Sequence, residues 1–294
     1  MMGTAGAGEP NITKCGAGVS GLDPSSERLK MWLPVLAAIL VPVCTALANR
    51  CHHRLIRFYR QRFLGWFKTC LTGMSPEERA FRYVLTNSTH GKPESVLSTL
   101  DEWCGKYERV TSTGPAKGQI LESVVQRSGP VRALELGTNC GYSAIRIARL
   151  LQPGAKLYTL EQDPKTAEVA EEMMLVAGLK HTQFQVITGS LSEAIPRFKK
   201  SLGVGTFDFV FLNQGQGTDY LKDLCQLEEE RLLSKGSVIL ANSVTHSGAA
   251  GFLSTVRGDP HYRTSFHPCT APYEKDITDG MEELVFLKDD GKRN

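Results

Sequence analysis

The amino-acid sequence predicts an α/β fold, in which a seven-stranded, mostly parallel sheet carries helices on both faces. From residue 73 onward, short apolar segments alternate with helical segments, a pattern typical of βαβ units. A glycine-containing turn follows the first apolar segment at residues 137–141, and polar side chains end several of the others. Because ligands of such sheets bind at the carboxyl ends of the strands, we expect the functional residues there.

Local signals predict the individual elements of this domain. Ser75, with a Glu three residues later, forms a capping box that begins a first helix. Residues 93–107 are a second expected helix, and residues 163–178 are a third, which starts with a capping Asp followed by Pro. Asp223 is expected near the start of a solvated helix. The expected strands are residues 131–137, 156–163, 184–190, 207–213, 237–243, 262–268 and 282–288.

Three segments precede the main domain, which we place at residues 73–294. Residues 1–30 form a polar leader. Residues 31–48 contain no charged side chain, and eighteen such residues are just long enough for a transmembrane anchor. Residues 49–72 mix basic and aromatic side chains, which predicts either an amphipathic helix on an anionic membrane surface or a plain linker helix.

The apolar segment also fits a second interpretation, a cleaved signal peptide. Ala46-Leu47-Ala48 matches the small-residue pattern of a cleavage site, although the polar leader is long for a signal peptide. Lys and Arg are more frequent after the segment than before it, so the positive-inside rule places the main domain in the cytosol. We therefore expect a single-pass protein of the endoplasmic reticulum membrane, in contact with membrane lipid.

Composition excludes several function classes. The net charge of the 294-residue chain is only +3, and no basic stripe with interleaved aromatic residues appears in the main domain, so no nucleic-acid partner is expected. The eight Cys residues show neither a metal-binding spacing nor a compact disulfide pattern.

The stretch LELGTNCGYSA, residues 134–144, points to a cofactor. Gly137 and Gly141 allow a tight turn and a close approach of the backbone to a ligand. Glu135 lies at the strand end, where a carboxylate can accept a hydrogen bond from a cationic amino group. Glu161 ends the next strand, about 25 residues further on, where an acid can bind both ribose hydroxyls. An amino-acid end at one tip and a ribose at the next describe S-adenosylmethionine.

Residues 73–294 resemble the catechol O-methyltransferase family. The resemblance rests on the stretches GPAKGQI, LELGTNCGYSAIRIARLLQPGAKL, FDFVFLN, RLLSKGSVILA and DGMEE, and it covers about three quarters of the chain. The apolar segment 31–48 and the stretch EERAFRYVLT make the chain most similar to the membrane-anchored branch of that family. The resemblance implies a Rossmann-like, class I S-adenosylmethionine-dependent methyltransferase fold.

The resemblance also implies a cofactor site that is partly altered. Gln214-Gly215 stand where the family has a His-Trp pair that covers the adenine. The other positions retain polar or glycine residues suited to S-adenosylmethionine. The implied cofactor-binding residues are Thr113, Glu135, Gly137, Thr138, Ser143, Glu161, Gln162, Ser190 and Asn213.

The family's magnesium-dependent chemistry is doubtful in this sequence. The family holds Mg²⁺ with an Asp at one strand tip and Asp-Asn at the next, and the corresponding residues here are Asn213 and Asn242-Ser243. Neutral amides compensate poorly for the dehydration of Mg²⁺, so we expect no tight metal site. The position of the family's catalytic Lys falls here at Gln216 or Gly217, and neither residue can act as a base.

Three further residues are candidates for the acceptor side. Tyr273 aligns with the family's substrate-gripping Glu, and Glu274 lies one place further on. His246 follows the fifth expected strand, where a neutral imidazole could act as a general base without a metal, although an ordinary loop His near the surface is the simpler explanation.

Two functions from different classes follow. The resemblance implies a membrane-anchored O-methyltransferase that transfers a methyl group from S-adenosylmethionine to a small catechol-like substrate, as in catecholamine metabolism. The altered residues favour an alternative, an inactive or weak homologue that binds a membrane-channel protein. For the membrane-anchored branch, the resemblance implies trafficking of the hair-cell mechanotransduction channel and a role in hearing.

Overall fold

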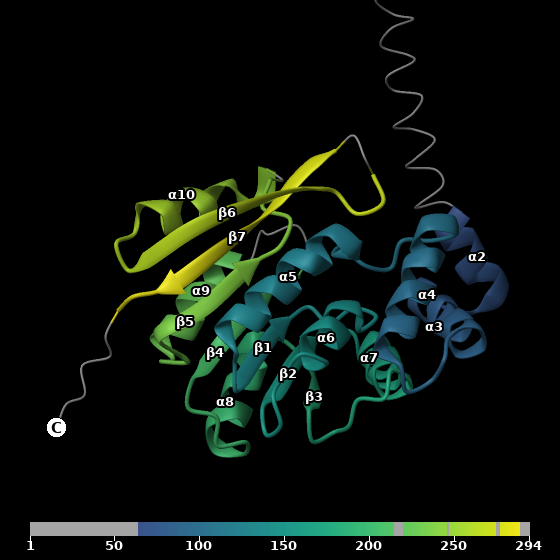
Figure 1. The fold of residues 1–294 in the computed structure, drawn as a ribbon, viewed down its shortest axis with the longest axis horizontal. Coiled ribbons are helices and arrows are strands. Elements are labelled where there is room, and N and C mark those ends of the chain that lie inside the picture. The colour runs from purple at the N-terminus through teal and green to yellow at the C-terminus, as the bar shows by residue number, and fades with distance from the viewer. Residues whose placement is uncertain (1–63, 215–219, 246, 275–276, 289–294) are drawn as a thin grey trace, which may run out of the picture. The chain divides into compact units, whose positions relative to one another are not determined.

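The computed structural model describes residues 64–214, 220–245, 247–274 and 277–288 (Figure 1). All of them belong to one compact unit, Gln61–Asn294. The expected transmembrane anchor and polar leader lie outside the described residues, and so does most of the basic juxtamembrane segment. Among the residues that the structure does describe, no helix has the length and apolar character needed to span a membrane.

Seven strands form one sheet in the order β3-β2-β1-β4-β5-β7-β6. The first five strands pair in parallel, whereas β7 is antiparallel to both β5 and β6. The predicted seven-stranded, mostly parallel sheet is therefore confirmed. The strands are β1 (Arg132–Leu136), β2 (Lys156–Glu161), β3 (Phe184–Thr188), β4 (Phe207–Leu212), β5 (Leu233–Ala241), β6 (Tyr262–Thr270) and β7 (Thr278–Phe286).

Helices cover both faces of this sheet (Figure 1). The described helices are α2 (Leu64–Thr72), α3 (Pro76–Asn87), α4 (Pro93–Lys106), α5 (Gly114–Ser128), α6 (Tyr142–Ala148), α7 (Pro164–Val176), α8 (Leu191–Lys200), α9 (Tyr220–Glu229), α10 (Ala250–Gly258) and the 3-10 turn η2 (Ser247–Ala249). The capping box of Ser75 and the Asp163 cap of α7 form as predicted.

Alternation along the strands divides the core into two layers. Phe209 and Phe211 of β4 pack with α3, α4, α5, α6 and α7, whereas Val210 and Leu212 face the layer that contains α8, α9 and α10. Successive strand side chains point to opposite faces, so a central parallel strand must be apolar throughout. The sequence FDFVFL of β4 meets this requirement from Phe209 onward.

Register places the ends of the central strands next to one another. Leu136 of β1 pairs with Leu212 of β4, which pairs with Ala241 of β5. The first residue after each strand is Gly137, Asn213 or Asn242. These three positions therefore lie side by side at the carboxyl edge of the sheet, where a ligand of this fold is expected.

Candidate functional site

Gly137 turns the chain at the tip of β1 and lets β4 approach closely. Its φ is +96°, a conformation that L side chains rarely adopt. A Cβ atom at this position would lie 2.9 Å from the backbone oxygen of Asn213 and 2.9 Å from the Cα of Gln214. The glycine is therefore required both by its backbone conformation and by the backbone packed against it.

Glu135 is a buried acid with one carboxylate oxygen left free. Its Oε2 accepts a hydrogen bond of 2.7 Å from the Thr159 hydroxyl, which also lies 2.5 Å from the Thr138 hydroxyl. Its Oε1 is buried and has no hydrogen-bond partner among the described residues. Burial raises the pKa of Glu135 to about 7, against the lowering effect of the nearby Ser143 and Thr159 hydroxyls. An unpartnered buried carboxylate oxygen is costly unless a cation or donor binds it.

Thr113, at the start of α5, adds a second unpartnered group. The residue is 1% exposed, and its hydroxyl oxygen has no partner within the described residues. The Thr138 hydroxyl, by contrast, bonds the Thr159 hydroxyl, which in turn donates to Glu135.

The predicted ribose acid lies at the tip of β2 and is oriented by the backbone. The Oε2 of Glu161 accepts a 2.8 Å hydrogen bond from the Asn139 N–H, and its Oε1 accepts two, of 2.9 Å from the Gln162 N–H and of 3.2 Å from the Asp163 N–H. Each carboxylate oxygen can accept two hydrogen bonds, so this fixed carboxylate retains one acceptor site, on Oε2, for a hydroxyl donor. The Gln162 side chain is exposed beside it.

Ser190 lies at the next strand tip and caps α8. Its N–H and its hydroxyl both donate to Oε2 of Glu193, at 2.7 and 2.8 Å. This capping box engages the hydroxyl that the family resemblance implies for cofactor binding. In the structure as it stands, Ser190 therefore orders the loop after β3.

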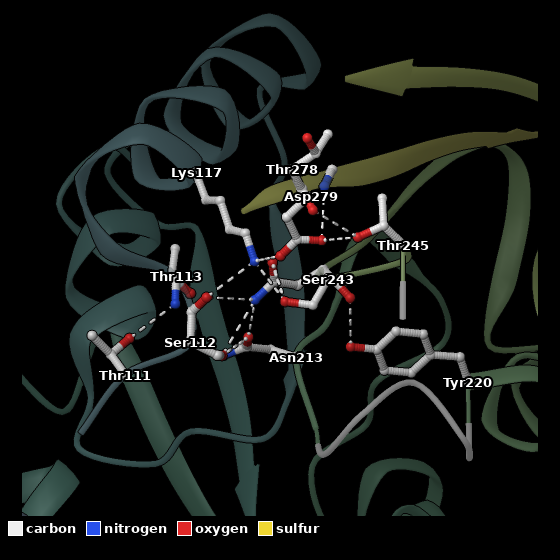
Figure 2. Close-up of polar contacts among 12 residues, drawn as sticks. Thr111, Ser112, Thr113, Lys117, Asn213, Tyr220, Ser243, Thr245, Thr278 and Asp279 are labelled. Carbon is white, nitrogen blue, oxygen red and sulfur yellow. Dashed lines mark hydrogen bonds and ion pairs between the residues drawn. The ribbon is translucent and has the colours of Figure 1, made fainter. Parts of the chain in front are cut away.

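Four polar residues form what we call the amide cluster: Ser112, Asn213, Asn242 and Ser243 (Figure 2). The Oδ1 of Asn213 accepts hydrogen bonds from Asn242 Nδ2 at 2.7 Å and from the Ser112 hydroxyl at 3.0 Å. The Nδ2 of Asn213 donates to the Gly137 carbonyl at 3.1 Å and to the Ser143 hydroxyl at 3.2 Å. Asn213 thus connects the cluster to the tip of β1.

A buried ion pair contacts this cluster. The Lys117 ammonium of α5 lies 2.5 Å from Asp279 Oδ2 of β7, and both side chains are almost fully buried. The same ammonium donates to the Ser243 hydroxyl at 2.5 Å and to the Ser112 carbonyl at 3.2 Å (Figure 2). Burial alone would raise the pKa of Asp279, but the hydrogen bond and charge of Lys117 outweigh it and hold that pKa below its usual value.

Magnesium does not fit the amide cluster. Mg²⁺ needs several oxygen ligands, with carboxylates supplying the neutralising charge. Here Asn213 and Asn242 use their amides to bond each other, and Ser243 accepts from a cation. The Asp279 carboxylate, on the other side of Lys117 from Ser243, is already neutralised by that lysine. Within the described residues, no group of three or more His, Cys, Asp or Glu side chains is placed to hold a metal ion.

The candidate acceptor residues are not gathered at this cluster. The Tyr273 hydroxyl donates to Asp101 Oδ1 of α4 at 2.8 Å, and its ring packs against the core. Glu274 forms an ion pair with Arg109. Gln216 and His246 lie outside the described residues. Burial raises the pKa of Asp101, which also accepts a hydrogen bond from Tyr142, so Tyr273 takes part in a polar contact inside the domain.

One expectation about the loop after β4 is wrong. Asp223 does not lie on a solvated face of α9 but is 6% exposed. It accepts a hydrogen bond from the side chain of Gln214, the residue that follows Asn213. The carboxylate therefore holds Gln214, at the start of the loop after β4, and is not exposed to solvent on the helix surface.

Sequence reasoning missed the two charged residues of the site. Lys117 lies within GPAKGQI, and Asp279 within DGMEE, but the stretches are far apart in sequence and each charge alone resembles a surface residue. The signal was the position of Lys117 on the helix. Leu121 and Val124 share its buried face, at i+4 and i+7, so a charge on that stripe requires a buried partner.

Comparison with known proteins agrees with this architecture. The model of a family described as O-methyltransferase matches residues 88–250. The chain is 39% identical over 253 residues to the transmembrane O-methyltransferase homolog of Mus musculus, covering 86% of this chain and 98% of the mouse protein. It is 37% identical over 284 residues to the transmembrane O-methyltransferase of Homo sapiens, covering 97% and 96% of the two chains.

A further relative and a solved structure extend the comparison. Catechol O-methyltransferase of Mus musculus is 38% identical over 230 residues, covering 76% of this chain and 86% of the mouse enzyme. The structure of the O-methyltransferase TomG from Streptomyces achromogenes, in complex with SAM, superposes with a TM-score of 0.57 at 22% identity, covering 73% of this chain and 100% of TomG. That likeness concerns the fold, which is the Rossmann-like fold of class I methyltransferases. This chain therefore belongs to the O-methyltransferase family.

Proposed function

We propose that this protein binds S-adenosylmethionine at the tips of β1 and β2 and belongs functionally with the hydroxyl-directed methyltransferases. The observation that carries the proposal is the unpartnered Oε1 of Glu135, which is buried beside a backbone turn that only glycine allows. The cationic amino group of the cofactor's methionine end would satisfy this oxygen. When bound, the cofactor supplies an activated methyl group to a nucleophilic oxygen.

Residues at the tips of β1 and β2 would bind different parts of the cofactor. Glu135 and the nearby Ser143 would hold the amino-acid end, with the unpartnered Thr113 hydroxyl as a further donor. Glu161, already fixed by three backbone N–H groups, would accept a hydrogen bond from a ribose hydroxyl at Oε2. Gly137 allows the backbone to approach the ligand closely.

For the acceptor, we propose a hydroxyl compound bound without magnesium. The names of the relatives suggest a catechol, and the amide cluster lies next to the β1 tip, where the methyl group would arrive. The absence of carboxylates in that cluster argues against the metal-assisted route, because a metal lowers the pKa of the attacking hydroxyl only if it is held.

A second candidate function is non-catalytic. Asn213 Oδ1 accepts a hydrogen bond from Asn242 Nδ2 instead of binding a metal, and no basic side chain of the described residues is free to take a proton at the cluster. Such a protein would use its fold and its membrane segment to bind a partner. From the family resemblance, that partner would be the mechanotransduction channel of hair cells, and the role would be in hearing.

The location completes the proposal. Two of the relatives carry transmembrane in their names, and residues 31–48 have the length and composition of a span. We propose a single-pass protein of the endoplasmic reticulum membrane whose methyltransferase domain faces the cytosol.

Cofactor binding and turnover test these functions separately. Titration calorimetry of the full-length chain with S-adenosylmethionine and S-adenosylhomocysteine should show binding that Glu135→Gln weakens about tenfold or more, because a charge-assisted hydrogen bond is lost. The matched control is Glu282→Gln, which alters another buried strand glutamate whose oxygens bond Arg257. Absence of cofactor binding by the unaltered chain would refute the proposal.

Transfer of radiolabelled methyl to 1,2-dihydroxybenzene, with Mg²⁺ or with a chelator, decides between the two candidates. Chelator-resistant turnover supports a metal-independent enzyme. Cofactor binding without turnover supports the partner-binding function. Turnover that rises with magnesium contradicts the interpretation of the amide cluster.

A further inference from the structure

The orientations of the two amides in the cluster follow from their fixed neighbours. The Gly137 carbonyl can only accept, so the group of Asn213 that faces it must be Nδ2. The Oδ1 of Asn213 then faces Asn242, which must present its own Nδ2 at 2.7 Å. The carboxamide oxygen of Asn242 is consequently turned toward Ser243.

Lys117 determines the direction of the Ser243 proton. An ammonium has three N–H groups, and those of Lys117 meet Asp279 Oδ2 at 2.5 Å, Ser243 Oγ at 2.5 Å and the Ser112 carbonyl at 3.2 Å. A lone pair of the Ser243 oxygen therefore points at the cation. Its O–H must point elsewhere, and accepting from a cation makes this O–H a stronger donor.

The Ser243 hydroxyl and the Asn242 carboxamide oxygen face each other and share one long hydrogen bond. The Ser243 hydroxyl lies 3.4 Å from Asn242 Oδ1, which is long for an O–H···O hydrogen bond. The Asn242 side chain is otherwise engaged only through Nδ2. A buried donor and a buried acceptor at this separation are poorly satisfied by each other, and a ligand group could satisfy both.

We propose that Ser243 and Asn242 form a hydroxyl-binding subsite for the methyl acceptor, with the Lys117–Asp279 ion pair as its positioning element. A ligand hydroxyl would accept the Ser243 proton and donate its own proton to Asn242 Oδ1. An ether oxygen lacks the proton for Asn242, so the subsite distinguishes a free hydroxyl from a methylated one. The inference rests on the proposed function, since it assigns the acceptor end of the same site.

The backbone of Ser243 supports a functional origin for this arrangement. Its φ is +54°, in the left-handed region that costs a residue with a Cβ some free energy. Glycine would adopt this conformation more readily, so the hydroxyl is held there against the local preference. Strained positions of this kind are concentrated at ligand sites.

The same conformation supplies a variant that folds without the hydroxyl. Ser243→Gly removes the hydroxyl and relieves the backbone, so loss of binding in this variant does not result from a misfolded tip. The matched control is Thr245→Ala, which removes a nearby hydroxyl that donates to the other oxygen of Asp279, Oδ1, at 2.8 Å.

Binding of 1,2-dihydroxybenzene and 1,2-dimethoxybenzene is measured by saturation-transfer NMR and calorimetry, on the full-length chain saturated with S-adenosylhomocysteine and containing a chelator. We expect the unaltered chain and Thr245→Ala to bind the dihydroxy probe and not the dimethoxy probe. Ser243→Gly should weaken dihydroxy binding about tenfold or more, with the affinity for S-adenosylhomocysteine within about twofold of the original.

Three results would overturn the subsite: equal dihydroxy binding in Ser243→Gly, equal binding of the two probes, or no dihydroxy binding by the unaltered chain with S-adenosylhomocysteine bound. Failure of the proposed function appears differently, as a lack of S-adenosylhomocysteine binding in the first titration. Loss of S-adenosylhomocysteine binding in Ser243→Gly alone would also contradict the inference, because it would place Ser243 at the cofactor end.

Discussion

The ammonium of Lys117 lies 2.5 Å from the Asp279 carboxylate, and the two side chains are 0% and 1% exposed. One comes from α5 and the other from β7, so the pair joins the helical layer to the antiparallel edge of the sheet. Burying two charges is tolerated here because each is paired and hydrogen-bonded, with Ser243, Ser112 and Thr245 supplying the remaining contacts.

Removing one partner of this pair should be far more destructive than removing both. We expect Lys117→Met to lower the free energy of unfolding by about 3–5 kcal/mol, because Asp279 is left buried and uncompensated. The double variant Lys117→Met/Asp279→Asn should recover part of that loss. Urea denaturation measures both.

A surface pair provides the matched control for this prediction. Lys106→Met breaks an ion pair with Glu102 whose side chains are 62% and 43% exposed, and it should cost at most about 1 kcal/mol. Equal losses in Lys117→Met and Lys106→Met would show that the buried pair has no special role. Because the pKa of Asp279 is lowered in the folded state, its contribution is present above the unfolded pKa and is lost as the pH falls through the folded value.

Glu135 should make stability depend on pH in the opposite direction. Burial raises its pKa from 4.5 to about 7, so the folded chain keeps a proton that the unfolded chain releases. Stability without cofactor should therefore fall by about 3 kcal/mol in total as the pH rises from about 4.5 to about 7. Denaturation curves across this range should show the decline in the unaltered chain and a flatter profile in Glu135→Gln.

Cofactor affinity should follow the same titration. A cationic amino group prefers the ionised carboxylate, so the affinity for S-adenosylmethionine should rise as the pH passes through about 7. An affinity independent of pH between 6 and 8 would contradict the assignment of Glu135 to the amino-acid end.

Much of the fold could be predicted from sequence because its signals are local. The apolar strands, the Ser75 capping box and the Asp163 cap each depend on a few neighbouring residues. The glycine turn after β1 and the acid at the β2 tip could be predicted for the same reason. The Lys117–Asp279 pair and the turn of Tyr273 toward Asp101 could not, because they join residues more than 150 positions apart.

Restoring carboxylates to the amide cluster should create a metal site at the expense of stability. In Asn213→Asp/Asn242→Asp, two negative charges would face each other across the present 2.7 Å contact and repel. We expect a lower melting temperature without metal and a marked rise on adding Mg²⁺ or Mn²⁺, whereas the melting temperature of the unaltered chain should not respond.

The single variant Asn213→Asp is the control. It adds one carboxylate, half the charge of the double variant, and creates no repelling pair. Adding Ser243→Asn and Gln216→Lys to the double variant tests whether magnesium-dependent methylation follows. A metal response in the unaltered chain would mean that neutral amides suffice to hold the ion.

Tyr273→Phe should affect stability and leave acceptor binding intact. The Tyr273 hydroxyl donates to Asp101, which is partly buried and has a raised pKa. Asp101 also accepts a hydrogen bond from Tyr142 and lies 3.8 Å from the Arg146 guanidinium. Losing this bond should cost about 1 kcal/mol. Tyr107→Phe, at a 50% exposed tyrosine, is the control. Weaker binding of 1,2-dihydroxybenzene at unchanged stability would instead indicate that Tyr273 contacts the acceptor.

Gly137→Ala separates close backbone packing from backbone conformation. Gly154 is a natural comparison, because its φ of +89° resembles the +96° of Gly137, but a Cβ there would meet nothing within 4 Å. Gly154→Ala should therefore show only the conformational cost, about 1–2 kcal/mol. Gly137→Ala adds contacts of 2.9 Å with the backbone of Asn213 and Gln214, so β1 and β4 must separate. We expect a larger loss of stability by urea denaturation, together with loss of S-adenosylhomocysteine binding by calorimetry. If the two alanine variants behaved alike, the tip of β1 would not need the close approach of β4 that aligns Glu135 with the amide cluster.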